Sequence, residues 1–299
     1  MNKNTLWQRP DIRFPVPFDT LFFDVDGVLI DTIASFHATD IAVAEYVAGT
    51  LHNLDWGQHE GKPLMTIADV DAFKQAGGYN NDWDMCYLLA ALATARLREW
   101  KGTPLAERTS QEWATLSRVA NVQGHGGREW VDTTFPASVR LDYDTIGDIY
   151  HEYYWGAADI RRRFGREPHY LPVFEGFVHL GMITGRVGPE VDSALERMET
   201  YSGEKWWEVV ISADICPKPD PQALRLAIEA TGARGGLYIG DTADDYDLIQ
   251  RYRDGKTGVE PDFLAAVLVV HPQEVELYKQ RGADIIVKLV EALLWYKTL

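Results

Sequence analysis

The spacing of strand-like apolar runs constrains the fold of this chain more than any other feature. One run lies early, at residues 21–25, and the next comes only at about residue 178. Helix-like segments separate the later runs, and one of them begins at Asp220-Pro221 with an N-cap followed by proline. Strands that alternate with helices predict a parallel sheet with helices on both faces. The later runs are 178–183, 209–211, 237–239, 266–270 and 285–287.

The long stretch between the first two runs has a different character. Strand patterning is almost absent from it, and its periodic segments are helical. We therefore expect an all-helical domain, residues 33–166, inserted into an α/β domain made of residues 1–32 and 167–299. Ligands of open α/β sheets bind beyond the carboxyl ends of the strands, so a domain inserted after the first strand would cover the site as a lid. The helical segments are 35–47, 65–76, 85–100, 111–119 and 145–163.

Charge and composition exclude several classes of protein. The 299 residues carry a formal net charge of −16, and the longest basic run is only 161–163, which argues against nucleic acid as a partner. The two cysteines are far apart, so neither a disulfide framework nor a zinc site is expected, and a reducing cytoplasm fits. No segment approaches the roughly 18 apolar residues of a membrane span, and residues 1–17 do not resemble a signal peptide. We expect a cytoplasmic protein with no membrane partner.

Two aspartates end the first apolar run, in the sequence Asp24-Val25-Asp26-Gly27. In an extended chain, side chains at positions i and i+2 point to the same face, so Asp24 and Asp26 would point the same way. Gly27 would let the chain turn sharply away from the strand. A polar turn after a buried strand is the simpler interpretation of this segment taken alone.

Three further polar segments each follow a later strand-like run. Thr184-Gly185 follows residues 178–183, Lys218 lies in a proline-rich loop after 209–211, and Gly240-Asp241 with Asp245 follows 237–239. Each has an ordinary alternative when it is taken alone. Thr184 could bond its local backbone, Lys218 could be solvated, and the aspartates could cap a helix.

Together, in this order and context, the four segments resemble the haloacid dehalogenase superfamily. Its phosphatase branch carries Asp-x-Asp-Gly after the first strand, Thr or Ser after the second, Lys before the fourth and Gly-Asp-x-x-x-Asp after the fourth. The chain's last strand and helix, from about residue 282, are also similar to those of the family. The resemblance covers the α/β part, while it covers the helical part only by position. It implies a Rossmann-like doubly wound parallel sheet with an inserted helical cap, as in the phosphoglycolate-phosphatase-like subfamily I.

The resemblance implies a role for each motif residue. Asp24 would be a nucleophile that forms an aspartyl-phosphate, ionised at neutral pH as an ordinary carboxylate is. Asp26 would act as general acid and base. The side chains of Asp24 and Asp241 and the main-chain carbonyl of Asp26 would bind Mg²⁺, which suits an all-oxygen ligand set, and Asp245 would support them. The phosphoryl oxygens would be held by Thr184, Gly185 and Lys218.

These roles predict an enzyme, a magnesium-dependent phosphatase that hydrolyses a small phosphorylated metabolite. The intact Asp26 argues against the dehalogenase and phosphonate-cleaving branches, which lack this acid. A phosphomutase of the β-phosphoglucomutase type uses the same core and stays open as an alternative. A non-catalytic phosphometabolite-binding protein is a third interpretation. The oligomeric state is also open.

Two segments of the helical part are candidates for substrate recognition. One contains Asn80, Asn81 and Trp83, although Asn81 or Asp82 could instead cap the following helix while Trp83 packs at its start. The other contains Arg128 after a glycine-rich run that could equally be a flexible connection.

Overall fold

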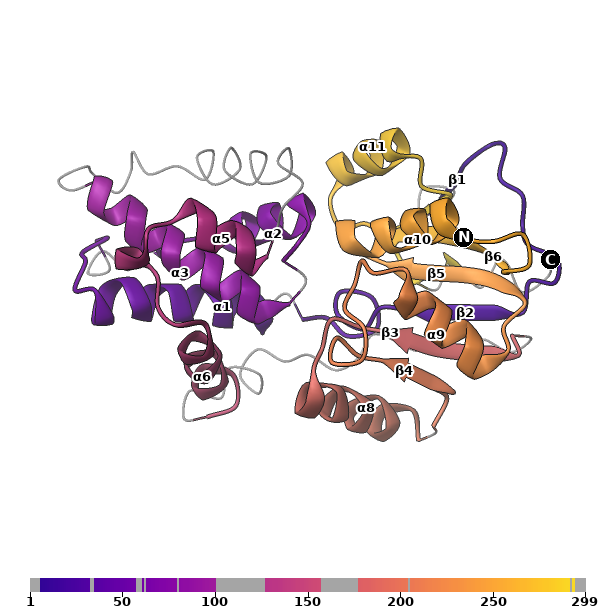
Figure 1. The fold of residues 1–299 in the computed structure, drawn as a ribbon, viewed down its shortest axis with the longest axis horizontal. Coiled ribbons are helices and arrows are strands. Elements are labelled where there is room, and N and C mark those ends of the chain that lie inside the picture. The colour runs from indigo at the N-terminus through magenta and orange to yellow at the C-terminus, as the bar shows by residue number, and fades with distance from the viewer. Residues whose placement is uncertain are drawn as a thin grey trace. The chain divides into compact units, whose positions relative to one another are not determined.

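The computed structural model describes residues 6–32, 35–57, 61, 63–79, 81–100, 127–156, 177–203, 205–290 and 292–293. The chain divides into two compact units, one made of residues 1–31 and 167–299 and the other of residues 32–166 (Figure 1). The predicted helix at 111–119 and the segment 157–176 lie outside the described residues.

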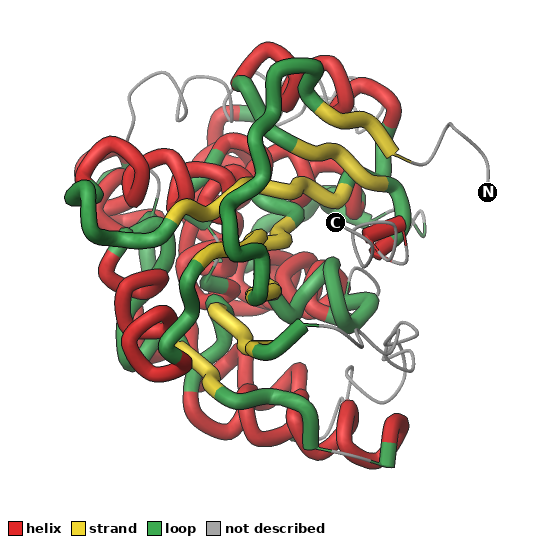
Figure 2. Tube along the Cα trace, turned by 90° about the vertical axis from the view of Figure 1, so that its right-hand side faces the viewer, coloured by secondary structure: helices red, strands yellow, loops and turns green. Residues whose placement is uncertain are grey.

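The first unit is built on a seven-stranded sheet, which confirms the predicted α/β fold (Figures 1 and 2). The strands lie in the order β1-β7-β6-β5-β2-β3-β4. The edge strand β1 pairs antiparallel with β7, and every other pair is parallel. The strands are β1 (Leu6–Gln8), β2 (Thr20–Phe23), β3 (His179–Ile183), β4 (Val209–Ile211), β5 (Gly235–Gly240), β6 (Asp262–Leu268) and β7 (Ile285–Val287).

Helices pack on both faces of this sheet, because alternate strand residues enter two separate cores. On β2, Leu21 and Phe23 belong to one core, which includes Met198 of α8. Phe22 between them belongs to the other core, which includes Leu224 of α9 and side chains of α10 and α11. Central strands that are buried on both faces explain the nearly continuous apolar runs of the sequence. These helices are α8 (Gly188–Ser202), α9 (Gln222–Thr231), α10 (Ala243–Gly255) and α11 (Pro272–Arg281).

The strand order places a topological switch point beside β2. From β2 the chain moves outward through β3 and β4, then returns to the other side of β2 as β5 and moves outward again. Phe23 at the end of β2 is in register with Met182 on β3 and Ile239 on β5. The residues that follow these three strands therefore leave the sheet side by side, at the position where open α/β sheets bind ligands.

The regular secondary structure of the second unit, within its described residues, is helical, as predicted. Its core holds many of the aromatic residues of this stretch, including Phe36, Trp130 and Tyr150. Helix α3 begins after the N-cap Asn81, whose Oδ1 accepts a hydrogen bond from the Trp83 amide at 2.8 Å. The helices are α1 (Phe36–Glu45) with a π-helical turn (Tyr46–Leu51), α2 (Ile67–Ala76), α3 (Asp82–Glu99), α5 (Arg128–Thr134), a 3₁₀ turn (Ala137–Val139) and α6 (Tyr143–Tyr154).

No helix in the described part of the chain is both long and apolar enough to span a membrane.

Candidate active site

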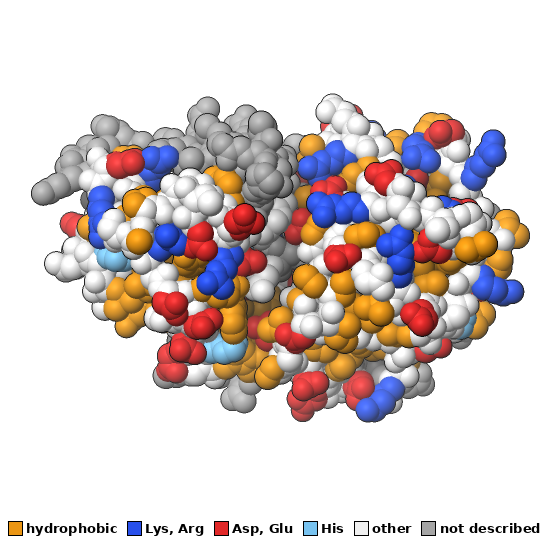
Figure 3. All heavy atoms as spheres, viewed as in Figure 1, with side chains coloured by type: hydrophobic (Ala, Val, Ile, Leu, Met, Phe, Trp, Pro, Cys, Tyr) orange, Lys and Arg blue, Asp and Glu red, His pale blue; other side chains and the backbone are white. Residues whose placement is uncertain are grey.

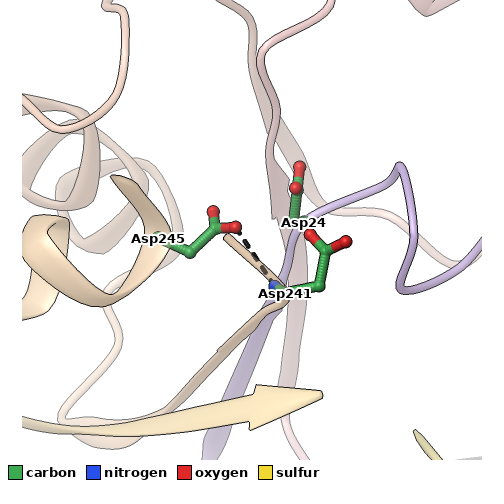
Figure 4. A group of neighbouring side chains, drawn as sticks. All are labelled: Asp24, Asp241 and Asp245. Atoms are coloured by element: carbon green, nitrogen blue, oxygen red, sulfur yellow. Dashed lines mark hydrogen bonds between the residues drawn. The ribbon is translucent and has the colours of Figure 1, made fainter. Parts of the chain in front are cut away.

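Three carboxylates converge where β2 and β5 end (Figure 4). Asp24 follows β2, Asp241 follows β5, and Asp245 lies in the first turn of α10. One oxygen from each lies within 4.8 Å of the other two. Asp24 and Asp245 are buried, and the backbone amide of Asp24 donates to the Ile239 carbonyl at 2.8 Å, which holds the ends of β2 and β5 together. Three carboxylates this close form a cluster that fits a hard divalent cation such as Mg²⁺.

Gly27 allows the chain to turn directly against this cluster. Its φ angle of +74° lies in the left-handed region, which favours glycine. A Cβ atom built at Gly27 would lie 2.0 Å from Asp241 Oδ2. A residue with a side chain at this position would therefore displace the carboxylate of Asp241, which explains the glycine after Asp26.

Lys218 supplies a buried positive charge between two of the carboxylates. Its Nζ lies 2.8 Å from Asp24 Oδ1 and 2.6 Å from Asp245 Oδ1. Burial by itself would lower the pKa of Lys218, but Asp24 and Asp245 outweigh it and raise that pKa above its ordinary value. The ammonium group therefore stays charged, and the alternative of a solvated lysine in a proline-rich loop is wrong.

Asp24 differs from the ordinary carboxylate that we expected from the sequence. Burial raises its pKa to about 7, with a further contribution from Asp245 and partial compensation by Lys218. The protein groups alone therefore leave Asp24 only partly ionised at neutral pH. A divalent cation at the cluster would favour the ionised form, which is the nucleophilic one.

Both oxygens of Asp245 are engaged by neighbouring groups. Oδ1 accepts hydrogen bonds from Lys218 Nζ and from Tyr238 OH, each at 2.6 Å. Oδ2 accepts from the amide of Asp241 at 3.2 Å and from the Thr242 hydroxyl at 2.6 Å, as part of the capping box of α10. Burial would raise the pKa of Asp245, but Lys218 and these hydrogen bonds lower it. Asp245 thus caps the helix and orients Lys218 at the same time, so the two interpretations of this segment are compatible.

Thr184 is buried directly after β3, next to the end of β2. Its amide donates to the Ile211 carbonyl at 2.9 Å, and its hydroxyl oxygen accepts from the Arg186 amide at 3.2 Å. The local hydrogen bonds considered for Thr184 are therefore present. They also fix the backbone at Gly185, at the same end of the sheet as the carboxylates.

Sequence reasoning missed two residues of this site, Arg186 and Tyr238. The Arg186 guanidinium contacts the Asp26 carboxylate, with Nε 3.1 Å from Oδ1 and 2.9 Å from Oδ2, and Nη2 2.7 Å from Oδ1. The Tyr238 hydroxyl donates to Asp245 and lies 3.2 Å from the Ile183 carbonyl. Two features of the sequence could have indicated them. One is a basic residue two positions after Thr184, and the other is a tyrosine, with its polar hydroxyl, inside the apolar run of β5.

The candidate recognition residues of the helical unit have local structural contacts. The ring centroid of Trp83 lies 5.1 Å from that of His151, and the Arg128 guanidinium lies 4.4 Å above the Tyr143 ring. Asn81 is the N-cap of α3, as one of the two interpretations held. Asn80 lies outside the described residues. A role of these four positions in substrate recognition stays a prediction.

No protein-family model matches the sequence. The fold is similar to phosphatase Tt82 from Thermococcus thioreducens, with 24% identity, a TM-score of 0.56, and coverage of 92% of this chain and 98% of that one. A haloacid dehalogenase-like hydrolase from Bacteroides fragilis gives a TM-score of 0.48 at 15% identity, covering 92% of this chain and 99% of that one.

Among curated proteins, an imidazoleglycerol-phosphate dehydratase from Phytophthora nicotianae is 26% identical over 233 residues, or 77% of this chain. The chain spans only 40% of the length of that protein.

The sheet order, the helical insertion after β2 and the motif residues at the ends of β2, β3 and β5 define one fold. The chain has an α/β Rossmann-like fold with a helical domain inserted after β2, and this fold is similar to that of phosphatase Tt82.

Proposed function

We propose that this protein is a magnesium-dependent phosphatase that hydrolyses a small phosphorylated metabolite through an aspartyl-phosphate on Asp24. The observation that carries the proposal is the buried Asp24 carboxylate, 2.8 Å from the Lys218 ammonium and within reach of two more carboxylates at the switch point of the sheet. A carboxylate can attack phosphorus only where positive charge offsets the repulsion between the two anions. Lys218 and a cation at the cluster would provide that charge.

Different side chains of the α/β unit would have different roles in the reaction. The Val25 amide and Lys218 both bind Asp24 Oδ1 at 2.8 Å, which fixes the orientation of the nucleophile. Thr184 and the amide at Gly185 would hold phosphoryl oxygens, and Lys218 would stabilise the charge that develops on them. Asp26 would protonate the leaving alcohol and then take a proton from water.

Mg²⁺, when bound, would be held by the side chains of Asp24 and Asp241 and the carbonyl of Asp26, and would neutralise the phosphoryl charge.

The helical unit would act as the cap that selects the substrate, with Asn80, Asn81, Trp83 and Arg128 as candidate recognition residues. We propose a small metabolite rather than nucleic acid as the partner. On the face of the molecule in Figure 3, basic side chains of the described residues are interspersed with acidic ones and form no continuous basic patch. Both cysteines are free and buried, which supports a reducing, cytoplasmic location.

The test is phosphate release from a panel of phosphorylated metabolites and 4-nitrophenyl phosphate, with Mg²⁺ and with EDTA. Imidazoleglycerol phosphate belongs in the panel because the curated relative is named for it. We expect release that depends on Mg²⁺ and is lost in Asp24→Asn, by at least about a thousand-fold, because the nucleophile itself is removed.

Asp19→Asn is the matched control, because Asp19 is also a buried carboxylate and lies just before the other end of β2, where it pairs with Arg234. This variant should keep its activity. Asp24→Asn with turnover near that of the wild type would disprove the covalent mechanism. Conversion between phosphate esters with little net release would indicate a phosphomutase instead.

A further inference from the structure

We propose that Arg186 is a positioning residue, which holds the carboxylate of Asp26 in place to activate water in the second half of the reaction. This role rests on the proposed phosphatase function and deepens it. Arg186 itself would contact neither the substrate nor the cation.

The first support is the contact itself. Three hydrogen bonds from Arg186 engage both oxygens of Asp26 at 2.7 to 3.1 Å. The Arg186 side chain is 5% exposed, and that of Asp26 is 18% exposed. A planar guanidinium that binds both oxygens of a carboxylate fixes the plane of the carboxylate as well as its position.

The second support is that Arg186 is held from several sides, so it is the fixed partner of the pair. Its amide donates to Thr184 Oγ1 at 3.2 Å, and its carbonyl accepts from the Ala213 amide at 3.0 Å. Its Nη1 donates to the Glu190 carbonyl in the first turn of α8 at 2.9 Å. The ends of β3 and β4 and the start of α8 therefore set the place of the guanidinium. Asp26, on the turn after β2, takes its orientation from it.

The third support is the chemistry of the two half-reactions. In the first, Asp24 attacks phosphorus, the bond from phosphorus to the ester oxygen breaks, and Asp26 gives its proton to the leaving alcohol. In the second, water attacks phosphorus, the bond to Asp24 breaks, and the water proton passes to Asp26, which restores both carboxyl groups.

A carboxylate whose two oxygens accept hydrogen bonds from a fixed guanidinium cannot rotate away, and it keeps lone pairs that can accept a proton from water. The contact therefore fits Asp26 as it acts in the second half-reaction, where it accepts that proton.

The experiment is a rapid-mixing measurement with 4-nitrophenyl phosphate and Mg²⁺, on the wild type, Arg186→Met and Asp26→Asn. The nitrophenolate leaving group departs without an acid, so its burst reports formation of the phosphoenzyme and the steady state reports its hydrolysis. We expect Arg186→Met to slow the steady state by about 10 to 100-fold, the range for a misplaced catalytic group, while the burst rate stays within about three-fold of the wild type. Phosphoenzyme should accumulate in this variant and be trapped by acid quench.

Arg186→Lys should hydrolyse the phosphoenzyme at an intermediate rate, since it keeps the charge but not the two-oxygen contact. In the double variant with Asp26→Asn, the loss should not exceed that of Asp26→Asn alone, because both changes remove one function. The matched control is Arg234→Met, which removes an arginine that pairs with Asp19 away from the site. It should leave both phases unchanged.

A slow burst together with a raised KM in Arg186→Met would assign Arg186 to substrate binding and overturn the proposal. An unchanged burst and an unchanged steady state would overturn it too, because Arg186 would then have no role in turnover. If Arg186→Met does not fold, the Arg186→Lys variant decides on the same two phases. A wild type with neither burst nor turnover would contradict the proposed function itself, and the role of Arg186 would fall with it.

Discussion

Lys218 and Asp40 are both buried ionisable residues, and different surroundings raise the pKa of each. Lys218 lies between two carboxylates, which keep it charged. Asp40 in α1 is fully buried, and the Cys86 thiol donates to its Oδ1 at 3.1 Å. Burial, together with the nearby Asp82, raises the pKa of Asp40 well above its ordinary value, although Lys74 and the hydrogen bond from Cys86 oppose this. These surroundings thus favour the neutral form of Asp40 over the ionised one.

The raised pKa of Asp40 makes a prediction about stability. Its contribution to stability is fully present below the unfolded-state pKa of 3.8, and is lost as the pH rises toward the folded-state value. We expect the free energy of unfolding to fall more steeply in the wild type than in Asp40→Asn as the pH rises above 3.8, by up to about 1.4 kcal/mol per pH unit.

Denaturant unfolding at a series of pH values measures this difference. Asp144→Asn, which changes an exposed carboxylate in α6, is the control and should keep the slope of the wild type. Equal slopes in Asp40→Asn and the wild type would show that Asp40 is ionised in the folded protein.

At the scale of one element, the N-cap residue Asn81 stabilises the start of α3, the longest described helix of the helical unit. This helix carries a long run of buried residues from Met85 to Thr94. The Asn81 side chain satisfies the Trp83 amide, one of the donors that a helix leaves unpaired at its first turn. Asn81 is therefore both the structural cap of α3 and a candidate recognition residue, and a pair of variants can separate the two roles.

Asn81→Ala should destabilise the protein by about 1 kcal/mol, because it removes the cap, whereas Asn81→Ser keeps a capping oxygen and should cost less. Thermal unfolding measures the loss of stability. The value of kcat/KM on a substrate found in the panel measures whether substrate recognition is affected. If Asn81 only caps the helix, Asn81→Ser keeps kcat/KM close to that of the wild type. A large loss of kcat/KM in a stable Asn81→Ser protein would instead assign its amide to the substrate.

At the scale of the whole molecule, the candidate metal cluster joins segments that are far apart in the chain. Asp24 precedes the helical unit in the sequence, whereas Asp241 and Asp245 follow it. The unfolded chain cannot bring these carboxylates together. A cation that binds them therefore stabilises the folded protein through linkage.

We expect Mg²⁺ at a hundred times its dissociation constant to raise the free energy of unfolding by about 2.7 kcal/mol, and EDTA to reverse this. Asp241→Asn should lose most of the effect, because it removes one of the two carboxylates proposed to bind the cation. Asp254→Asn, an exposed position at the end of the same helix α10 that follows Asp241, controls for general charge and should respond as the wild type does. Equal stabilisation of Asp241→Asn would place the cation elsewhere.

Much of this protein could be predicted from local sequence. The runs that became β2, β5 and β7 are apolar because these strands are buried on both faces, and that pattern is visible in the chain itself. The helical unit could also be predicted from local sequence, because its apolar residues recur with the period of a helix and not with the pattern of the strands. Asp24, Lys218 and Asp241 were singled out because each follows a strand-like run, in the order that the resembling family shows.

The remaining features depend on which distant residues meet in the folded chain. Strand β1 is three residues long and gains its place by pairing with β7 at the other end of the sequence. The contact of Arg186 with Asp26 joins residues 160 positions apart, and no local pattern specifies that distance.

The pKa of Asp24 was predicted as ordinary, but burial and the neighbouring Asp245 raise it to about 7. Hydrophobic pattern and motif order are properties of neighbours along the chain, so the fold class and the motif residues could be predicted without the structure. Burial, pairing and electrostatic coupling are properties of neighbours in space, so they were determined only when the chain folded.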